Sequence, residues 1–196
     1  MWKDAEEFLS KDKYIGPLIQ KWGSCTITPL KKSQYFEDLV NAICSQQLSG
    51  KAAETIFGRV KKLLIKINPE NILSKSDQEL RDCGLSWSKV SYIKDLAVRV
   101  KNEELRFSSA IKINNLNSLQ DEEVITELIK VKGIGRWTAE MFLMFSLARP
   151  DILPNADLGI NKALKNLNIK PKDTEKWKPY RTVASWYLWR SLENRG

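Results

Sequence analysis

Residues 129–140 read IKVKGIGRWTAE, and this stretch predicts a helix that stops at two glycines and a second helix that starts at once. Gly133 and Gly135 flank one isoleucine. Glycine adopts backbone angles that other residues avoid, and it has no side chain to cover its own N–H group. We therefore expect a sharp turn between two helices, with amide donors that an anion can reach.

Apolar residues recur at helical spacing on both sides of this turn. The stripes comprise Phe36, Leu39, Val40, Ile43 and Cys44, then Ile56, Val60, Leu63, Leu64 and Ile67, then Val124, Ile125, Leu128 and Ile129, and last Thr138, Met141, Phe142 and Phe145. Ser76 opens a capping box, and CGL at 83–85 predicts a glycine stop before a helix over 88–101. A strand-like pattern occurs only at 105–113, LRFSSAIKI. The sequence predicts an all-α fold.

Composition narrows the function. The chain of 196 residues suits one domain or two small lobes, and it contains no histidine, so catalysis would rest on carboxylates, lysines, hydroxyls or the backbone. Cys25, Cys44 and Cys83 have no metal-binding spacing and are expected to be reduced core residues. The charged N-terminus and the absence of a long apolar run predict a cytoplasmic protein, in the nucleoid or the nucleus, that does not enter a membrane.

The net charge of +8 favours a polyanionic partner. Residues 162–196 carry nine basic and three acidic side chains. From charge alone, a solvated lysine-rich surface explains this excess as well as nucleic-acid binding does. A helix, a glycine turn and a second helix would bind one phosphate through free amides and the helix dipole. A single G-x-G is weak evidence, because many helix caps share it.

The stretch RPDILPNADLGINKAL at 149–164 follows the second helix. Two prolines end helical structure there, and Asp157 opens a new amphipathic helix, where an aspartate usually serves as the N-cap. The order of hairpin, helix and LP-x-x-DLG resembles the helix-hairpin-helix DNA glycosylase superfamily. That family places its essential aspartate at the position of Asp157.

Two more segments extend the resemblance over about residues 33–192. AICSQQLSGKAAETIFGRV at 42–60 looks like the segment with the DNA-wedging loop in the alkylpurine branch, the 3-methyladenine DNA glycosylase II type, and WKPYRTVASWYLW at 177–189 looks like its last core helix. The resemblance implies a two-lobed helical fold with the active site in the cleft between lobes. Residues 33–115 would form the lobe with the wedge loop. Residues 116–196 and the N-terminal segment would form the lobe with the hairpin and Asp157.

The resemblance also implies site residues. Asp157 would face the sugar, where it stabilises an oxocarbenium-like transition state or orients the attacking water. Gln47 would fill the gap left by the flipped base, with Ser49 beside it at the minor groove. The implied base pocket comprises Trp137, Trp189 and Met141, the last at a position where some relatives have tyrosine. The implied DNA contacts are Gln46, Gln47, Ser49, Lys132, Gly133, Gly135, Arg136 and Thr138. Without the family pattern, Gln46 and Gln47 read as a polar helix end and the tryptophans as core.

No cofactor is expected to be required, and an iron–sulfur cluster is excluded because no cysteine lies beyond residue 83. Relatives often bind Na⁺ or K⁺ at the hairpin through main-chain carbonyls, which correspond to those of Ile129, Val131 and Ile134. Lys132 replaces a common proline there. Trp137 stands where glycosylases that also cut the backbone have a Schiff-base lysine, so the resemblance implies a monofunctional enzyme without lyase activity.

The function implied is base excision repair of alkylated purines such as 3-methyladenine, whose positive charge already weakens the glycosidic bond. The expected partner is double-stranded DNA with alkylated bases, bound by a monomer. Two alternatives stay open. One is a non-catalytic DNA-binding or damage-sensing helix-hairpin-helix module, and the other is a glycosylase for oxidised purines, which the missing lysine argues against. The range of lesions, including 7-methylguanine, is not determined by the sequence.

Overall fold

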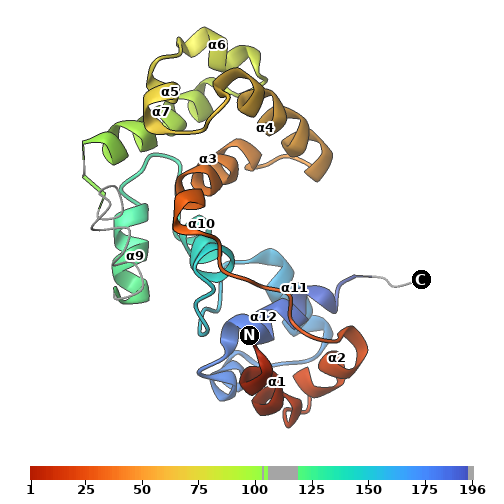
Figure 1. The fold of residues 1–196 in the computed structure, drawn as a ribbon. Coiled ribbons are helices and arrows are strands. Elements are labelled where there is room, and N and C mark those ends of the chain that lie inside the picture. The colour runs from red at the N-terminus through yellow and green to blue at the C-terminus, as the bar shows by residue number, and fades with distance from the viewer. Residues whose placement is uncertain (103, 106–118, 194–196) are drawn as a thin grey trace. The chain divides into compact units, whose positions relative to one another are not determined.

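The computed structural model describes residues 1–102, 104, 105 and 119–193, and every regular element within these residues is a helix (Figure 1). The all-α prediction is therefore confirmed. The strand-like stretch 105–113 lies outside the described residues, apart from Leu105. The chain divides into two compact units. The central unit is Leu30–Ala139, and the terminal unit combines Met1–Pro29 with Glu140–Gly196.

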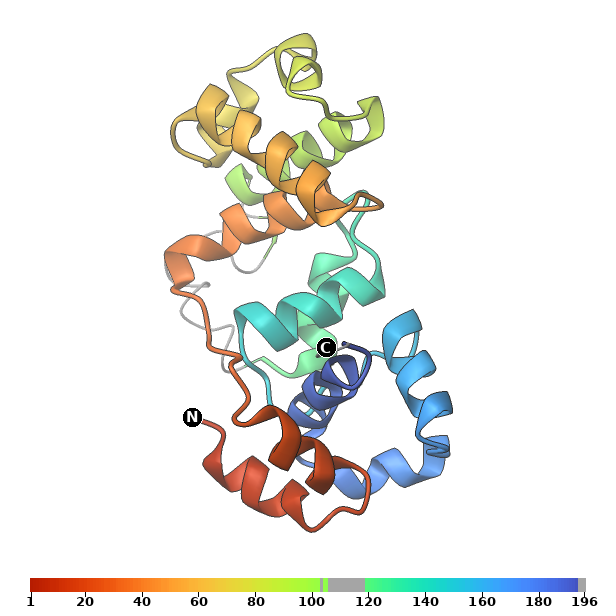
Figure 2. The same ribbon diagram turned by 90° about the vertical axis from the view of Figure 1, so that its right-hand side faces the viewer.

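The central unit contains η1 (Lys32–Gln34), α3 (Tyr35–Ser45), α4 (Gly50–Leu64), α5 (Pro69–Leu73), α6 (Asp77–Asp82), α7 (Trp87–Lys101), α9 (Asp121–Leu128) and the start of α10 (Arg136–Met141). Helix α7 packs against α3, α5 and α6, and Figure 2 draws these helices in orange, yellow and green. The apolar faces of these helices supply fully buried side chains, including Leu39, Ile43, Ile93 and Leu96.

Local capping signals in this unit are confirmed. The Glu79 amide donates to Ser76 Oγ at 3.2 Å, and the Ser76 amide donates to the Glu79 carboxylate at 2.8 Å, which completes the predicted capping box. Gly84 has φ +100° at the predicted stop. The next helix then begins at Trp87, one residue before the predicted start, with Ser86 as its N-cap.

The terminal unit is built around α12 (Arg181–Arg190), which packs against α1 (Lys3–Ser10), α2 (Ile15–Trp22), α11 (Leu158–Asn166) and η4 (Pro171–Trp177). Most of α12 is buried, and its buried residues include the polar side chains of Thr182 and Ser185. Tyr187 on this helix donates from its hydroxyl to the Gly23 carbonyl at 2.8 Å. This bond holds the N-terminal segment against α12.

The three cysteines are buried and free, as predicted. Burial raises the pKa of the Cys44 thiol to about 12 and that of Cys25 to about 11, so both stay protonated at neutral pH. No helix in the described part of the chain is long and apolar enough to cross a membrane.

The hairpin groups with the central unit, whereas it was expected in the lobe of residues 116–196 and the N-terminal segment. The physical reason lies in its contacts. The Lys132 amide donates to Asp95 on α7, and the Gly133 carbonyl accepts from Gln46 after α3. The helix before the turn also ends at Leu128, which leaves Ile129 48% exposed rather than in the predicted apolar stripe.

Candidate functional site

The hairpin turn between α9 and α10 requires glycine at one of its two glycine positions. Gly133 has φ +81°, and a Cβ there would lie 2.1 Å from Cδ2 of Tyr92. Gly135 has no positive φ, and a Cβ there would meet no atom within 4 Å. The backbone freedom of glycine, from which the sharp turn was expected, is therefore used at Gly133 and not at Gly135. Only Gly133 is needed for the turn itself.

Of the four amides at residues 132–135, two are used and two are open, and one of the used amides is that of Ile134, which donates to the Val131 carbonyl at 3.1 Å. The Lys132 amide donates to Asp95 Oδ2 at 2.9 Å, and Arg99 Nε donates to the same oxygen at 2.9 Å. No hydrogen bond among the described residues uses the amide of Gly133 or Gly135. Such amides before the first turn of a helix are suited to a phosphate oxygen.

The segment 46–49 between α3 and α4 is the predicted wedge loop. Gln47 has φ +56°, which is uncommon for a residue with a side chain, and Gln47, Leu48 and Ser49 are exposed. Gln46 instead donates from Nε2 to the Gly133 carbonyl at 2.8 Å. The structure therefore brings the wedge loop and the hairpin together through Gln46, although they are far apart in sequence.

The remaining DNA-contact predictions lie on or next to the start of α10. Arg136 Nη1 donates to Glu122 Oε2 of α9 at 3.0 Å, and this interaction holds the pKa of the Glu122 carboxyl below its usual range. Lys132 is exposed, whereas Thr138 is buried, so of these two only Lys132 presents its side chain at the surface. Trp137 is 44% exposed, which is high for so large an apolar side chain.

Asp157 in the terminal unit is the N-cap of α11, as predicted from its position. Its Oδ1 accepts from the Ile160 amide at 2.7 Å and also from the indole Nε1 of Trp189 at 2.9 Å. The aspartate is only 8% exposed. A Cβ at Gly159 would lie 3.0 Å from the Trp189 ring and 3.1 Å from Asp157 Oδ1, so glycine at this position lets the indole reach the carboxylate.

Phe145 is a candidate pocket residue that no sequence motif indicated. Its ring lies against that of Trp189, with centroids 5.8 Å apart and planes at 32°, and it is 39% exposed. Phe145 belongs to the π-helical turn η3 (Phe142–Ser146), which follows α10. One wide turn changes the direction of the side chains in it, and such turns are frequent at functional sites. The other predicted pocket residue of this unit, Met141, ends α10 and is partly buried.

The segment before Asp157 is anchored to the start of α12. Arg181 pairs with both carboxylate oxygens of Asp151, at 2.7 Å and 2.9 Å, and this raises the pKa of the guanidinium. Thr182 Oγ1 accepts from the Ile152 amide at 3.0 Å and donates to the Arg149 carbonyl. These contacts position the chain that leads to the carboxylate, and their partners are about thirty residues apart, which explains why no local pattern predicted them.

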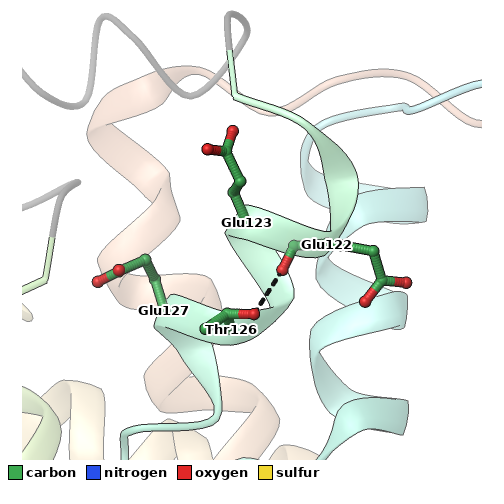
Figure 3. Close-up of a pocket in the computed structure, with 4 residues that line it drawn as sticks. All are labelled: Glu122, Glu123, Thr126 and Glu127. Carbon is green, nitrogen blue, oxygen red and sulfur yellow. Dashed lines mark hydrogen bonds between the residues drawn. The ribbon is translucent and has the colours of Figure 1, made fainter.

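A separate pocket of about 260 Å³ on α9 is lined by Glu122, Glu123, Thr126 and Glu127. Figure 3 shows the three carboxylates pointing in different directions from the helix. Glu122 is paired with Arg136, and Glu127 is paired with Lys130. An acidic pocket of this kind would repel the phosphates of DNA and offers no converging groups for a ligand.

Comparisons with known proteins identify a family and several similar proteins. The family model "HhH-GPD superfamily base excision DNA repair protein" matches residues 40–186. DNA-3-methyladenine glycosylase 1 of Schizosaccharomyces pombe is 37% identical over 83% of this chain and 74% of its own. The alkylbase DNA glycosidase-like protein mag2 of the same yeast is 34% identical over 96% of this chain and 93% of its own. The structure of the S. pombe 3-methyladenine DNA glycosylase Mag1 in complex with abasic DNA superposes with a TM-score of 0.78, at 32% identity, over 98% of each chain.

Proposed function

The chain belongs to the HhH-GPD superfamily of base excision DNA repair proteins, and we propose that it uses Asp157 to release alkylated purines from DNA. Its relatives at 37% and 34% identity are named as a 3-methyladenine glycosylase and an alkylbase glycosidase-like protein. It is therefore an alkylpurine DNA glycosylase of base excision repair. The observation that carries the catalytic assignment is the Asp157 carboxylate, buried and oriented by two N–H donors.

Asp157 acts on the sugar of the damaged nucleotide. Loss of an alkylated base leaves positive charge on the sugar, and a preorganised carboxylate stabilises that charge without having to reorganise. The Ile160 amide and the Trp189 indole both donate to Oδ1, so they set the direction in which the carboxylate points. The same group can orient the attacking water. Because the leaving base is already cationic, the reaction needs little acid assistance, which suits a chain without histidine.

Aromatic rings receive the flipped base. A cationic purine is attracted to ring faces by about 0.5–2 kcal/mol for each ring, in addition to stacking. Phe145 and Trp189 form one such ring pair in the unit that holds Asp157, and Trp137 on α10 is exposed. Met141 lies one helical turn after Trp137 and replaces an aromatic side chain with a flexible thioether. This replacement favours a pocket that accepts more than one shape of alkylated purine.

The hairpin and the wedge loop hold the DNA. The free amides of Gly133 and Gly135 and the start of α10 bind a backbone phosphate, and the exposed Lys132 adds charge. Gln47 enters the base stack and occupies the space of the flipped nucleotide, with Ser49 beside it. Flipping a base costs a few kcal/mol, and an inserted side chain offsets part of that cost.

A monovalent cation, Na⁺ or K⁺, is the ligand proposed for the carbonyls of Ile129, Val131 and Ile134. The Val131 carbonyl accepts one hydrogen bond, from the Ile134 amide at 3.1 Å, and within the described residues no donor reaches the carbonyls of Ile129 or Ile134. Neutral carbonyl oxygens are suitable ligands for a monovalent cation. A bound cation would add positive charge beside the phosphate. No other cofactor is proposed.

The enzyme is proposed to be monofunctional, since Trp137 occupies the place of the Schiff-base lysine and an indole cannot act as that nucleophile. It is proposed to bind double-stranded DNA as a monomer and to leave an abasic site in an unbroken strand. Its setting is that of the DNA itself, the nucleoid or the nucleus. The alternative of a non-catalytic damage sensor explains the hairpin and the charge, but not the Trp189 donor directed at Asp157.

Substitution of Asp157 by Asn tests the assignment. Asparagine caps helices as well as aspartate does, and its oxygen can accept from Ile160 and Trp189, so the variant should fold. It lacks the negative charge, and we expect release of 3-methyladenine in single-turnover assays to fall at least about a hundredfold, equivalent to about 2.7 kcal/mol. DNA affinity should stay near that of the wild type.

Asp173→Asn is the matched control, because it makes the same change at a partly buried aspartate of the same unit, in the capping box of η4. Its excision rate should equal that of the wild type. Release of free 3-methyladenine by the wild type excludes the non-catalytic DNA-binding module. Release of an oxidised purine instead would favour the alternative of a glycosylase for oxidised purines. If Asp157→Asn releases base at the wild-type rate, the aspartate is a helix cap and the catalytic assignment is wrong.

A further inference from the structure

The C-terminal end of α3 is held by a lysine from another helix. Lys89 on α7 donates from Nζ to the Cys44 carbonyl at 2.8 Å and to the Gln46 carbonyl at 2.7 Å. The last carbonyls of a helix have no partner within it, and a cation is favourable at that end. The two contacts therefore satisfy main-chain groups at the point where the helix passes into the wedge loop.

One of these carbonyls determines how Gln47 is held. The Gln46 carbonyl and the Gln47 amide belong to the same rigid peptide plane. The orientation of that plane sets φ of Gln47, which is +56° and costs free energy for a residue with a side chain. A strained angle persists only where neighbouring contacts enforce it. Lys89 supplies such a contact directly before the exposed side chains of Gln47 and Leu48.

The same face of α7 also holds the hairpin. Tyr92 and Asp95 follow Lys89 at intervals of three residues, which places all three side chains along one side of the helix. Tyr92 packs where a Cβ of Gly133 would lie, and Asp95 accepts from the Lys132 amide. The Gln46 amide group then joins the loop to the hairpin. Helix α7 is thus the common support of the two elements that grip DNA.

We propose that Lys89 is a positioning residue for base flipping, which presets Gln47 in its strained conformation so that the wedge is formed before DNA arrives. The proposal rests on the proposed role of Gln47 as the wedge. Without Lys89 the peptide plane between Gln46 and Gln47 relaxes, and the loop has to be ordered during binding. Loss of water around the ammonium lowers the pKa of Lys89, which agrees with carbonyl oxygens having replaced that water.

The test compares the same alkylated purine in two duplexes, one with its normal partner base and one with a mismatched partner that weakens pairing. Flipping limits the reaction most where pairing is good. Lys89→Met removes the donors and keeps much of the side-chain length. We expect its single-turnover excision to fall about tenfold or more in the paired duplex and less than about threefold in the mismatch.

Lys94→Met is the matched control, since it makes the same change on the same helix and removes only an exposed ion pair with Asp77. It should lower neither rate. Lys89→Arg keeps donors at the carbonyls and should retain most of the excision in the paired duplex. A purely structural role for Lys89 would lower both rates together, and that outcome overturns the proposal.

Gln47→Ala separates this proposal from the proposed function. If Gln47→Ala slows excision selectively in the paired duplex and Lys89→Met does not, the wedge role stands and the role of Lys89 is wrong. If neither variant distinguishes the duplexes, the wedge role itself is wrong. If both do, the double variant should be no slower than the slower single variant, because both changes remove the same step. If Lys89→Met fails to fold, Lys89→Gln is compared in the same two duplexes. Glutamine has a shorter side chain and an uncharged amide donor.

Discussion

Trp189→Phe removes one hydrogen bond and leaves an aromatic ring. The indole N–H lies 2.9 Å from Asp157 Oδ1, whereas the ring faces Phe145. Phenylalanine keeps a ring on the Phe145 side and has no N–H group. The substitution therefore separates two proposed roles of Trp189, the orientation of the carboxylate and the stacking of the base.

The size of the effect follows from the chemistry of this bond. A hydrogen bond to a charged group contributes about 1.5–3 kcal/mol, and each 1.36 kcal/mol is tenfold in rate. If the whole contribution were specific to the transition state, excision would slow by about ten- to a hundredfold. Trp189 also bonds to Asp157 before reaction, and only the part gained in the transition state affects the rate. The Ile160 amide still holds the carboxylate, so we expect a loss of about tenfold.

The assay is single-turnover release of 3-methyladenine, with DNA affinity and thermal unfolding measured in parallel. Trp186→Phe is the control, because it makes the same change on α12 at a buried indole that lies against the Tyr187 ring and the Arg190 guanidinium. It should lower stability through lost packing and leave the rate of the folded enzyme intact. A Trp189→Phe rate within about threefold of the wild type would refute the orienting role, and Trp189 would then act only through its ring.

Three further expectations concern the hairpin and the chemistry. Gly133→Ala should unfold at a lower temperature than the wild type, because φ at this position is +81° and the Tyr92 ring occupies the place of a Cβ. Gly135→Ala should have the melting temperature of the wild type and bind DNA more weakly. Equal melting temperatures for the two variants would contradict the assignment of Gly133 to the turn and Gly135 to DNA. Borohydride should trap no covalent adduct with DNA because Trp137 stands in the lysine's place, and an efficient adduct would contradict it. The logarithm of the DNA association constant should fall steeply and linearly with the logarithm of salt concentration, as counterions leave the phosphates, and a flat line would count against the basic hairpin as the DNA contact.

The parts of the fold that the sequence predicted are those set by neighbours along the chain. Helical periodicity, the capping box at Ser76 and the cap at Asp157 each involve residues within one or two turns. The membership of the hairpin in the central unit was not predictable in this way. It depends on contacts such as Gln46 with Gly133, whose partners are 87 residues apart. No local pattern encodes such a pairing.

The candidate site likewise has one part that local sequence predicts and another part that depends on contacts between distant residues. Asp157 could be selected from a motif, but its orientation depends on Trp189, which lies 32 residues later on another helix. Phe145 was expected in an apolar stripe, and the π-helical turn instead leaves it 39% exposed beside Trp189. The run FLMF contains no glycine or proline that would indicate such a turn. The sequence motif therefore selected Asp157 as the proposed reactive group, and packing determines what surrounds it.

The two glycines of the hairpin show why one motif can contain two different constraints. At Gly133 the constraint is internal, because a side chain there would need a strained backbone and would overlap Tyr92. At Gly135 nothing in the chain would meet a side chain, and the backbone angle is one that other residues adopt. The open space at Gly135 leaves room for a partner from outside, and the partner that we propose is a DNA phosphate. The free amide of Gly135 lies directly before α10, where a phosphate would come within hydrogen-bonding distance, and a methyl group there would hinder that approach. The structure alone thus separates the glycine that makes the turn from the glycine that we assign to DNA.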